Sequence, residues 1–381
     1  MTRAIANAHI LTPAGFRDDL AVLIEGTKIA AVVPEAGIPP DAERHDLGGL
    51  TLVPGFIDSQ VNGGGGVLFN ESPTVEAIAA IGAAHRAFGT TGFLPTLISD
   101  DLDIVRRGVE AVDSAIEAGV PGVIGIHIEG PFLNADRKGI HDESKFRALD
   151  HQGFAAVTAL KRGRTLVTLA PERTTPEMVR RLADSGVIVA AGHTDGSYRD
   201  IRAALDNGLT GFTHLFNAMS PLTAREPGAV GAALEDRDSW CGLIVDGRHI
   251  DPVTMRLALR CKPAERFMLV SDAMPSVGLV EKSFMLQGRP VRVVDGVCVN
   301  EDGTLAGSDL DMASAVRNAA AMLGIDLETA IRMASLHPAR FLGLDTVRGA
   351  IAAGLEADLV LLDGAGMVVE TWIGGARLVP G

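Results

Sequence analysis

Short apolar runs alternate with longer segments of helical pattern along most of this sequence, and this alternation most restricts how the chain can fold. The apolar runs are expected to be strands that end at Asp58, Leu97, Glu129, Ala170, His193, His214, Asp246 and Asp272. Helical periodicity between them marks residues 74–88, 102–118, 175–185 and 197–207, among others. Strands that alternate with helices form parallel sheets, and eight such units can close a (β/α)8 barrel.

Both ends of the chain differ from this central part. Residues 3–53 and the C-terminal segment contain short apolar pieces separated by turns, and residues 25–28 are expected to form a hairpin turn. We therefore predict an α/β protein whose (β/α)8 TIM-type barrel spans residues 54–342. A small β-sandwich domain would be built from residues 1–53 and 343–381.

Composition and charge exclude several classes of protein. The 47% hydrophobic residues and 44 glycines fit an α/β protein with many tight turns. The formal net charge of -14 argues against a nucleic-acid or anionic-membrane partner, so an anionic substrate would need a local basic pocket. The 3 cysteines are too few for a disulfide framework and are expected to be buried apolar residues. With no signal-peptide pattern and no apolar run long enough to span a membrane, we expect a soluble cytoplasmic protein.

Acidic residues and histidines stand at the ends of several predicted strands. A barrel brings the carboxyl ends of its strands to one face, so Glu129, His193, His214, Asp246 and Asp272 should lie close together. One carboxylate and two imidazoles form a metal site that leaves a position for water, whose pKa falls to roughly 7. Asp272 could take a proton from this water and pass it to a leaving amine.

A set of sequence motifs follows this strand order and covers nearly the whole chain. They are Pro-Gly-Phe-Ile-Asp at 54–58, His-Ile-Glu-Gly-Pro-Phe at 127–132, Gly-His-Thr at 192–194, Thr-His-Leu-Phe-Asn-Ala-Met at 213–219, Arg-Glu-Pro-Gly at 225–228, Asp-Gly-Arg-His at 246–249 and Ser-Asp-Ala at 271–273. Together they resemble the N-acetylglucosamine-6-phosphate deacetylases of the amidohydrolase superfamily. The resemblance implies hydrolysis of N-acetyl-D-glucosamine 6-phosphate to D-glucosamine 6-phosphate and acetate, in amino-sugar catabolism or cell-wall recycling.

The resemblance also implies a role for individual residues. Glu129, His193 and His214 would bind the metal, and Asp272 would be the general base and then the general acid. His141 would polarise the substrate carbonyl. The remaining substrate contacts would be Ile140, Asn217, Ala218, Arg225, Asp246, His249, Leu305, Ala306 and Gly307.

Within this set, Asn217 and Ala218 would meet the sugar phosphate, with Arg225 and His249 adding charge and hydrogen bonds. Residues 305–307 would form a loop over the acetyl group. In several relatives the phosphate-binding arginine and histidine come from a neighbouring subunit. A homodimer with a shared phosphate site is therefore expected.

One departure from the wider superfamily concerns the number of metals. Many amidohydrolases carry His-x-His after the first strand to hold a second metal, whereas this chain has Gln60-Val61-Asn62 there. Amides are poor ligands for transition metals, so we predict one tightly held divalent metal per subunit, and a second is in doubt. Zinc is expected first, although a Glu-His-His site also accepts iron, manganese or cobalt.

Several alternatives remain open at this point. N-acetylgalactosamine 6-phosphate differs from the gluco substrate at a single sugar hydroxyl, which the sequence does not reveal. A cyclic-amide hydrolase would usually need two metals, and a catalytically silent sugar-phosphate sensor would not need Asp272. His127 lies on the same face of its strand as Glu129, but we expect it to pack behind the ligands. The glycines at 63–66 predict a close backbone approach rather than a phosphate-binding loop.

Overall fold

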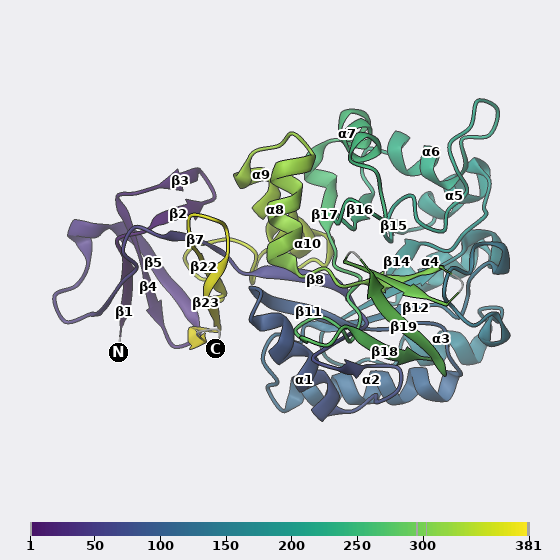
Figure 1. Ribbon diagram of the computed structural model, residues 1–381, viewed down its shortest axis with the longest axis horizontal. Coiled ribbons are helices and arrows are strands. Elements are labelled where there is room, and N and C mark those ends of the chain that lie inside the picture. The colour runs from purple at the N-terminus through teal and green to yellow at the C-terminus, as the bar shows by residue number, and fades with distance from the viewer. Residues whose placement is uncertain (1, 295, 302, 379–381) are drawn as a thin grey trace.

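The computed structural model describes residues 2–294, 296–301 and 303–378. A large unit of strands and helices lies beside a smaller unit of strands, and the smaller unit carries both ends of the described chain (Figure 1). Met1 and residues 379–381, which the predicted terminal segments include, lie outside the described residues. The domain bounds at 53/54 and 342/343 stay a prediction.

The large unit contains a sheet of eight parallel strands in sequence order. They are β8 (Phe56–Val61), β11 (Thr90–Leu97), β12 (Gly125–Glu129), β13 (Arg164–Leu169), β14 (Ile188–Ala191), β15 (Leu209–Phe212), β16 (Trp240–Leu243) and β17 (Phe267–Leu269). The two outer strands approach each other where a parallel bridge joins Val61 to Ala273, just after β17. The sheet therefore forms a nearly closed barrel, and the predicted (β/α)8 fold is confirmed.

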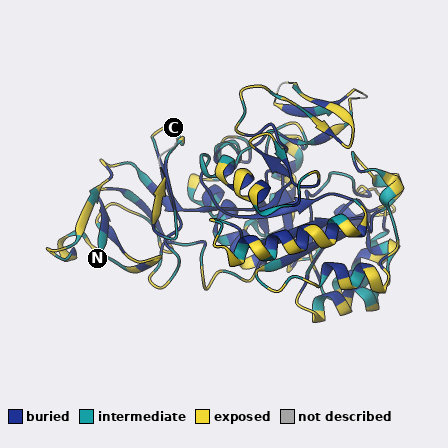
Figure 2. Ribbon diagram, turned by 90° about the horizontal axis from the view of Figure 1, so that it is seen from below, coloured by how far each residue is buried: buried dark blue, intermediate teal, exposed yellow. Residues whose placement is uncertain are grey.

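Helices connect the barrel strands and cover them, with buried inner and exposed outer faces (Figure 2). They are α1 (Val75–Arg86), α2 (Leu102–Glu117), α3 (His151–Val157), α4 (Pro176–Asp184), α5 (Tyr198–Leu205), α6 (Gly228–Glu235), α7 (Pro252–Cys261), α8 (Met312–Met322), α9 (Leu327–Ala334) and α10 (Leu336–Phe341). Short 3-10 turns occupy Glu35–Gly37, Ala135–Arg137, Glu143–Lys145, Pro171–Arg173 and Ala264–Arg266. Side-chain caps explain several helix starts, since Thr74, Thr175 and Ser197 each accept a hydrogen bond from the backbone N–H three residues later. Among the described residues, none of these helices is both long and apolar enough to cross a membrane.

The smaller unit is a sandwich of two sheets. One has the order β5-β4-β1-β6 and contains β1 (Arg3–Ala6), β4 (Leu20–Glu25), β5 (Lys28–Pro34) and β6 (Glu43–Asp46). The other has the order β24-β23-β22-β7-β2-β3 and contains β2 (His9–Thr12), β3 (Gly15–Arg17), β7 (Thr51–Pro54), β22 (Leu359–Leu362), β23 (Val368–Ile373) and β24 (Ala376–Leu378). β7 pairs with β22, so the two ends of the chain share one sheet, and a common apolar core includes Ile10, Leu52 and Trp372. The predicted small β domain is therefore present, and its hairpin turns at Gly26, which has a φ of 60°.

Several predicted strand ends were wrong by a few residues. The strands expected to end at His193, His214 and Asp272 end earlier, at Ala191, Phe212 and Leu269. These three polar residues have positive φ values of 47°, 33° and 53°, which interrupt the extended backbone before them. The strand expected to end at Asp246 likewise ends at Leu243, while the first barrel strand continues past Asp58 to Val61.

An antiparallel sheet after β17 was not predicted. It contains β18 (Ser283–Leu286), β19 (Arg289–Val294), β20 (Val297–Asn300) and β21 (Leu305–Ser308) and forms a separate layer that projects from the barrel (Figure 2). The expected loop at residues 305–307 is therefore part of a strand. Much of β18 and β19 is exposed, so their sequences lack the continuous apolar character that identified the barrel strands.

The structure also tests the predictions for the glycine run and for the cysteines. Gly63 lies in β9 (Gly63–Gly64), which pairs with β10 (Val67–Leu68), and a Cβ there would lie 2.3 Å from the Val67 carbonyl oxygen. The predicted close backbone approach is therefore confirmed at this position. Cys241 and Cys298 are buried as predicted, but Cys261 at the end of α7 is exposed, so the prediction for it was wrong.

Candidate active site and metal centre

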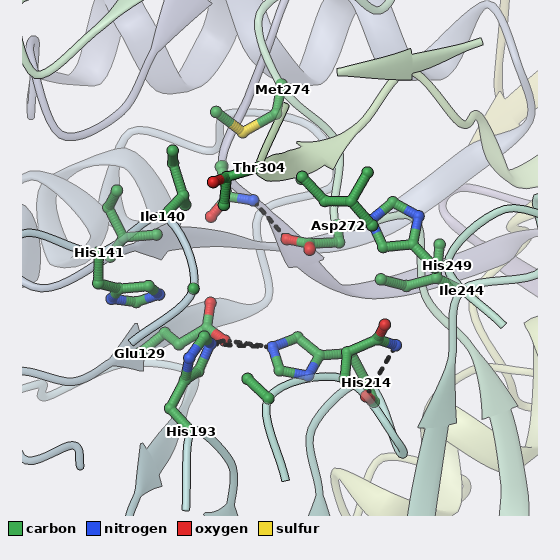
Figure 3. A pocket seen from close by; sticks show the side chains of 17 residues that line it. Glu129, Ile140, His141, His193, His214, Ile244, His249, Asp272, Met274 and Thr304 are labelled. Carbon is green, nitrogen blue, oxygen red and sulfur yellow. Dashed lines mark hydrogen bonds and ion pairs between the residues drawn. The ribbon is translucent and has the colours of Figure 1, made fainter. Parts of the chain in front are cut away.

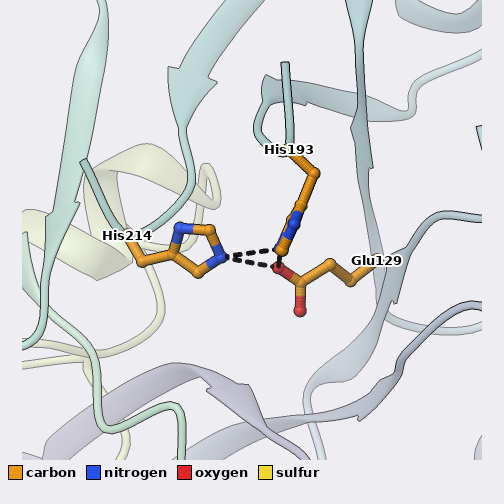
Figure 4. Close-up of side chains that lie close together, drawn as sticks. All are labelled: Glu129, His193 and His214. Atoms are coloured by element: carbon orange, nitrogen blue, oxygen red, sulfur yellow. Dashed lines mark hydrogen bonds and ion pairs between the residues drawn. The ribbon is translucent and has the colours of Figure 1, made fainter. Parts of the chain in front are cut away.

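Three buried side chains converge at the carboxyl ends of the barrel strands. Glu129 ends β12, and His193 and His214 follow the ends of β14 and β15 (Figure 4). Oε1 of Glu129 lies 2.9 Å from Nε2 of His214 and 3.2 Å from Nε2 of His193, and the two Nε2 atoms are 3.1 Å apart. One carboxylate oxygen and two imidazole nitrogens aimed at a common point form a ligand set that suits a divalent transition metal.

A hydrogen bond of His193 fits this role. Nδ1 of His193 lies 2.8 Å from the carbonyl oxygen of Arg137. Since a carbonyl oxygen only accepts, Nδ1 carries the proton and donates this hydrogen bond. The lone pair of Nε2 therefore points toward the cluster. Burial alone would raise the pKa of Glu129, but the imidazole rings of His193 and His214 beside its Oε1 hold this pKa well below its usual value. The carboxylate is therefore ionised and ready to bind a cation.

Asp272 faces this cluster across two side-chain amides. Nδ2 of Asn62 donates to Oδ1 of Asp272 at 2.7 Å. Nε2 of Gln60 donates both to Oδ1 of Asp272, at 3.1 Å, and to Oε2 of Glu129, at 3.0 Å. Desolvation and then the negative charge of Glu129 raise the pKa of Asp272 to about 6. A carboxyl group of this pKa can accept a proton and return it near neutral pH.

His141 lies beside the cluster, with its ring centroid 4.3 Å from that of His193 (Figure 3). Its Nδ1 accepts the backbone N–H of Ser99 at 3.2 Å and lies 2.8 Å from Oγ of Ser99. Because a backbone N–H can only donate, Nδ1 is the acceptor, and the proton of the neutral ring is on Nε2. Burial and then the neighbouring His193 hold the pKa of His141 well below its usual value, so the ring is a neutral donor.

His127 lies outside the cluster. Its Nε2 lies 2.8 Å from Oγ1 of Thr168 and its Nδ1 lies 3.3 Å from Oγ1 of Thr96. Burial lowers the pKa of His127 to about 4, so the ring is neutral. It packs behind the ligands, as the sequence predicted.

A single pocket joins the cluster to most of the predicted substrate contacts (Figure 3). Its walls include the predicted residues Glu129, Ile140, His141, His193, His214, Asn217, Ala218, His249, Asp272, Leu305 and Gly307. Three other predicted contacts do not line it, namely Ala306, Asp246 and Arg225. Ala306 is buried in an apolar cluster with Met274, and Asp246 lies behind His249.

Asp246 orients His249. Its Oδ2 lies 2.6 Å from Nδ1 of His249, and its Oδ1 accepts the backbone N–H groups of Arg248 and His249 at 2.8 and 2.9 Å. Burial would raise the pKa of Asp246, but the hydrogen bonds from His249 and Arg248, together with the charge of His249, lower this pKa. His249 thus lines the pocket of its own chain, whereas the resemblance implied a histidine from a neighbouring subunit.

Arg225 is the third predicted contact that the structure does not bring to the pocket. It lies in an exposed loop before α6. Among the residues that line the pocket in the described part of the chain, none is a lysine or an arginine. The lining of this pocket in the described part of the chain therefore supplies no permanent cation to a phosphate.

Several residues at the site were not predicted from the sequence. Ile98, Gly139, Ile244, Met274 and Thr304 line the pocket, but apolar and small residues of this kind give no sequence signal for function. Ser99, which holds His141, follows β11 without any recognisable motif. The sequence does contain a signal for Asp58, because an isolated carboxylate in an apolar strand needs buried hydrogen-bond partners.

Known proteins resemble this chain along its whole length. The model of the amidohydrolase family matches residues 51–378. An N-acetylgalactosamine-6-phosphate deacetylase of Shewanella sp. (strain ANA-3) is 44% identical, over 89% of this chain and 86% of that protein. The human N-acetylglucosamine-6-phosphate deacetylase is 38% identical, over 87% of this chain and 84% of that protein. The crystal structure of N-acetylglucosamine-6-phosphate deacetylase from Pasteurella multocida has a TM-score of 0.96 at 33% identity, with 100% of both chains covered.

Proposed function

This chain belongs to the amidohydrolase family, and on that premise we propose that it is a metal-dependent deacetylase of an amino-sugar 6-phosphate. N-acetyl-D-glucosamine 6-phosphate is the first candidate substrate, and acetate and D-glucosamine 6-phosphate are its products. The observation that carries this proposal is the convergence of Glu129, His193 and His214 beside Asp272 in one pocket. The names of the similar enzymes support the substrate class.

The proposed chemistry is the hydrolysis of an amide. A divalent cation held by Glu129, His193 and His214, zinc first and iron, manganese or cobalt as alternatives, would supply Lewis acidity and lower the pKa of water. Asp272 accepts a proton from the attacking water, and the water oxygen forms a bond to the acyl carbon. Nε2–H of His141 donates a hydrogen bond to the carbonyl oxygen as negative charge develops there. Asp272 then gives its proton to the amine nitrogen as the C–N bond breaks, and the acetic acid leaves as acetate once its remaining proton passes to solvent.

We assign one cation to each subunit. The amide nitrogens of Gln60 and Asn62 already donate to Oδ1 of Asp272, and Gln60 also donates to Oε2 of Glu129. These donors satisfy the carboxylate oxygens that a second cation would need. The geometry therefore supports a mononuclear site.

A cation for the phosphate group would have to come from outside the described residues that line this pocket. Phosphate is usually bound by cations, and Arg225 lies on an exposed loop outside the pocket of its own chain. We propose a homodimer in which Arg225 of one subunit completes the phosphate site of the other, while His249, Asn217 and Ala218 come from the same chain as the metal ligands. The cytoplasmic location and the roles in amino-sugar catabolism or cell-wall recycling stay predictions.

N-acetylgalactosamine 6-phosphate is the second candidate substrate. The 44% identical Shewanella protein carries that name, and the two sugars differ only in the configuration of one hydroxyl. The described pocket residues support an amino-sugar phosphate without favouring either epimer. A silent sensor is disfavoured, because it would have no use for Asp272 with its pKa of about 6.

The test is release of acetate and free amine by the purified protein, with the metal content measured on the same sample. The two epimeric 6-phosphates and unphosphorylated N-acetylglucosamine are compared as substrates. We expect turnover that requires the phosphate and follows about one metal per chain. Equal turnover without phosphate would overturn the assigned substrate class, and no turnover by the metal-loaded protein would favour the sensor.

A further inference from the structure

Asp58 is a buried carboxylate that the proposed reaction does not use. It lies in the middle of β8, is 0% exposed and lies on no wall of the active-site pocket. Its Oδ1 accepts the backbone N–H groups of Gln60 and Ser271, both at 3.2 Å, and its Oδ2 accepts the hydroxyl of Ser271. Asp58 thus connects the first barrel strand to the segment after the last one.

This connection spans the closing seam of the barrel. Other neighbouring barrel strands are joined by ladders of backbone hydrogen bonds, but β8 and β17 do not pair directly. Near the seam, a bridge joins Val61 to Ala273, and the backbone N–H of Asp272 donates to the carbonyl oxygen of Gln60 at 3.1 Å. The carboxylate of Asp58 therefore supplies hydrogen bonds where a strand ladder is incomplete.

The two residues that Asp58 holds belong directly to the catalytic geometry. Gln60 is the residue whose side-chain amide touches both Glu129 and Asp272. Ser271 immediately precedes Asp272, whose backbone has a φ of 53°, a conformation that a non-glycine residue keeps only when its surroundings hold it. Ser308 supports the same turn, because its backbone N–H donates to the carbonyl oxygen of Asp272 at 2.9 Å.

We propose that Asp58 is a positioning residue for the deacetylase reaction. It fixes the backbone at Gln60 and Ser271, and it thereby keeps the Asp272 carboxylate against the amides and in line with Glu129. Asp58 itself touches neither the substrate nor the ligand cluster. This inference rests on the proposed function, because it assigns Asp58 to the geometry of that reaction.

The test is the substitution Asp58→Asn in the full-length, metal-loaded enzyme. Asparagine keeps the shape of the side chain and an oxygen for the two backbone donors, but its NH2 group replaces the oxygen that accepts the Ser271 hydroxyl. We expect kcat per bound metal to fall at least about tenfold, because small displacements of catalytic groups cost this much or more. KM should stay within about twofold of the wild-type value, since Asp58 does not reach the pocket.

A matched control separates positioning from general stability. Asp358 is another buried aspartate, and it accepts the backbone N–H of Gly374 at 2.8 Å and pairs with Arg348 at 3.1 Å, away from the pocket. Asp358→Asn should lower the melting temperature and leave kcat per bound metal within about twofold of the wild type. If Asp58→Asn behaves in the same way, Asp58 stabilises the seam and the positioning role is overturned.

A second variant decides the question if Asp58→Asn does not fold. Ser271→Ala keeps Asp58 and removes the hydroxyl that donates to it and that also accepts the backbone N–H of Ala273 at 3.1 Å. A lower kcat with retained metal supports the positioning role, and an unchanged kcat overturns it. Wild-type enzyme that fails on both epimeric 6-phosphates would count against the proposed function instead, so the two failures are distinguishable.

Discussion

The side-chain amide of Gln60 donates a 3.0 Å hydrogen bond to Oε2 of Glu129. The other carboxylate oxygen, Oε1, faces His193 and His214. One oxygen of Glu129 is thus available to a cation, while the other is occupied by an amide donor. This division distinguishes the site from one in which a carboxylate bridges two metals.

The first prediction concerns the number of metals. The wild-type protein should bind about one zinc per chain, and chelation should abolish turnover until metal is restored. The double variant Gln60→His/Asn62→His should bind a second equivalent, because imidazoles would replace the amides beside Glu129 and Asp272. Elemental analysis after dialysis measures both stoichiometries. Two tightly bound metals in the wild type would contradict the mononuclear site.

A second prediction assigns proton transfer to Asp272. Asp272→Asn should lower kcat by about 10²- to 10⁴-fold, the usual contribution of a general acid–base group. The variant should retain its metal, because Asp272 does not belong to the cluster of Glu129, His193 and His214. Steady-state kinetics and metal analysis of the same sample check both statements. A turnover near that of the wild type, or loss of the metal, would remove Asp272 from this role.

The pH dependence of the reaction is the third prediction. The pKa of Asp272 is raised to about 6, and Glu129 contributes to this rise through its negative charge. A base acts only when it is deprotonated, so kcat/KM should fall as the pH drops through this pKa. A cation bound to Glu129 would offset the negative charge of this carboxylate. In the metal-loaded enzyme, the fall of kcat/KM on the acid side should therefore lie at or below about pH 6. An acid limb above pH 7, or one that persists in Asp272→Asn, would contradict this assignment.

A fourth prediction concerns the hydrogen bond between Ser99 and His141. Ser99→Ala removes the hydroxyl that lies 2.8 Å from Nδ1 but keeps the backbone donor, so kcat should fall by about 3- to 30-fold. His141→Asn should have the larger effect, about 10²-fold or more, because it removes the donor to the carbonyl oxygen.

Ser335→Ala provides a control for that experiment. Ser335 is buried, and its hydroxyl donates to the carbonyl oxygen of Ile331 at 2.7 Å, outside the residues that line the pocket. Its loss should reduce stability and leave kcat unchanged. If Ser99→Ala matches this control in kcat, the orientation of His141 does not depend on Ser99.

The fifth prediction tests the shared phosphate site. Arg225→Met should raise KM for the 6-phosphate substrate by about 10- to 100-fold, because it removes a charged hydrogen-bond donor. The stability of the subunit fold should not change, since Arg225 is exposed within its own chain. Kinetics and thermal unfolding of the purified variant measure the two effects. An unchanged KM would exclude Arg225 from phosphate binding.

Mixed dimers show which subunit supplies the arginine. In a heterodimer of Arg225→Met and Asp272→Asn chains, one pocket would combine an intact Asp272 with the arginine of the other chain. Activity should therefore exceed that of either parent homodimer if Arg225 acts across the interface. No gain in the mixed dimer would mean that each arginine serves its own chain.

The sequence alone determined the barrel architecture and indicated the candidate metal ligands. Hydrophobic periodicity indicates strands and helices locally, and eight alternating units leave few arrangements other than a barrel. Because that barrel brings strand ends together, it already placed Glu129, His193, His214 and Asp272 at one site. Their separation in the sequence was no obstacle, since the fold class predicts which ends of the strands meet.

Only the tertiary structure decided which side chains reach the pocket and what holds them. Asp246 follows a barrel strand as Asp272 does, yet one lies behind His249 and the other faces Glu129. Contacts such as Ser99 with His141 and Asp58 with Ser271 join segments 42 and 213 residues apart. Periodicity places a residue on a strand or at its end, but a hydrogen bond depends on backbone turns and packing to within a fraction of an ångström. That information arises only when the whole chain is folded.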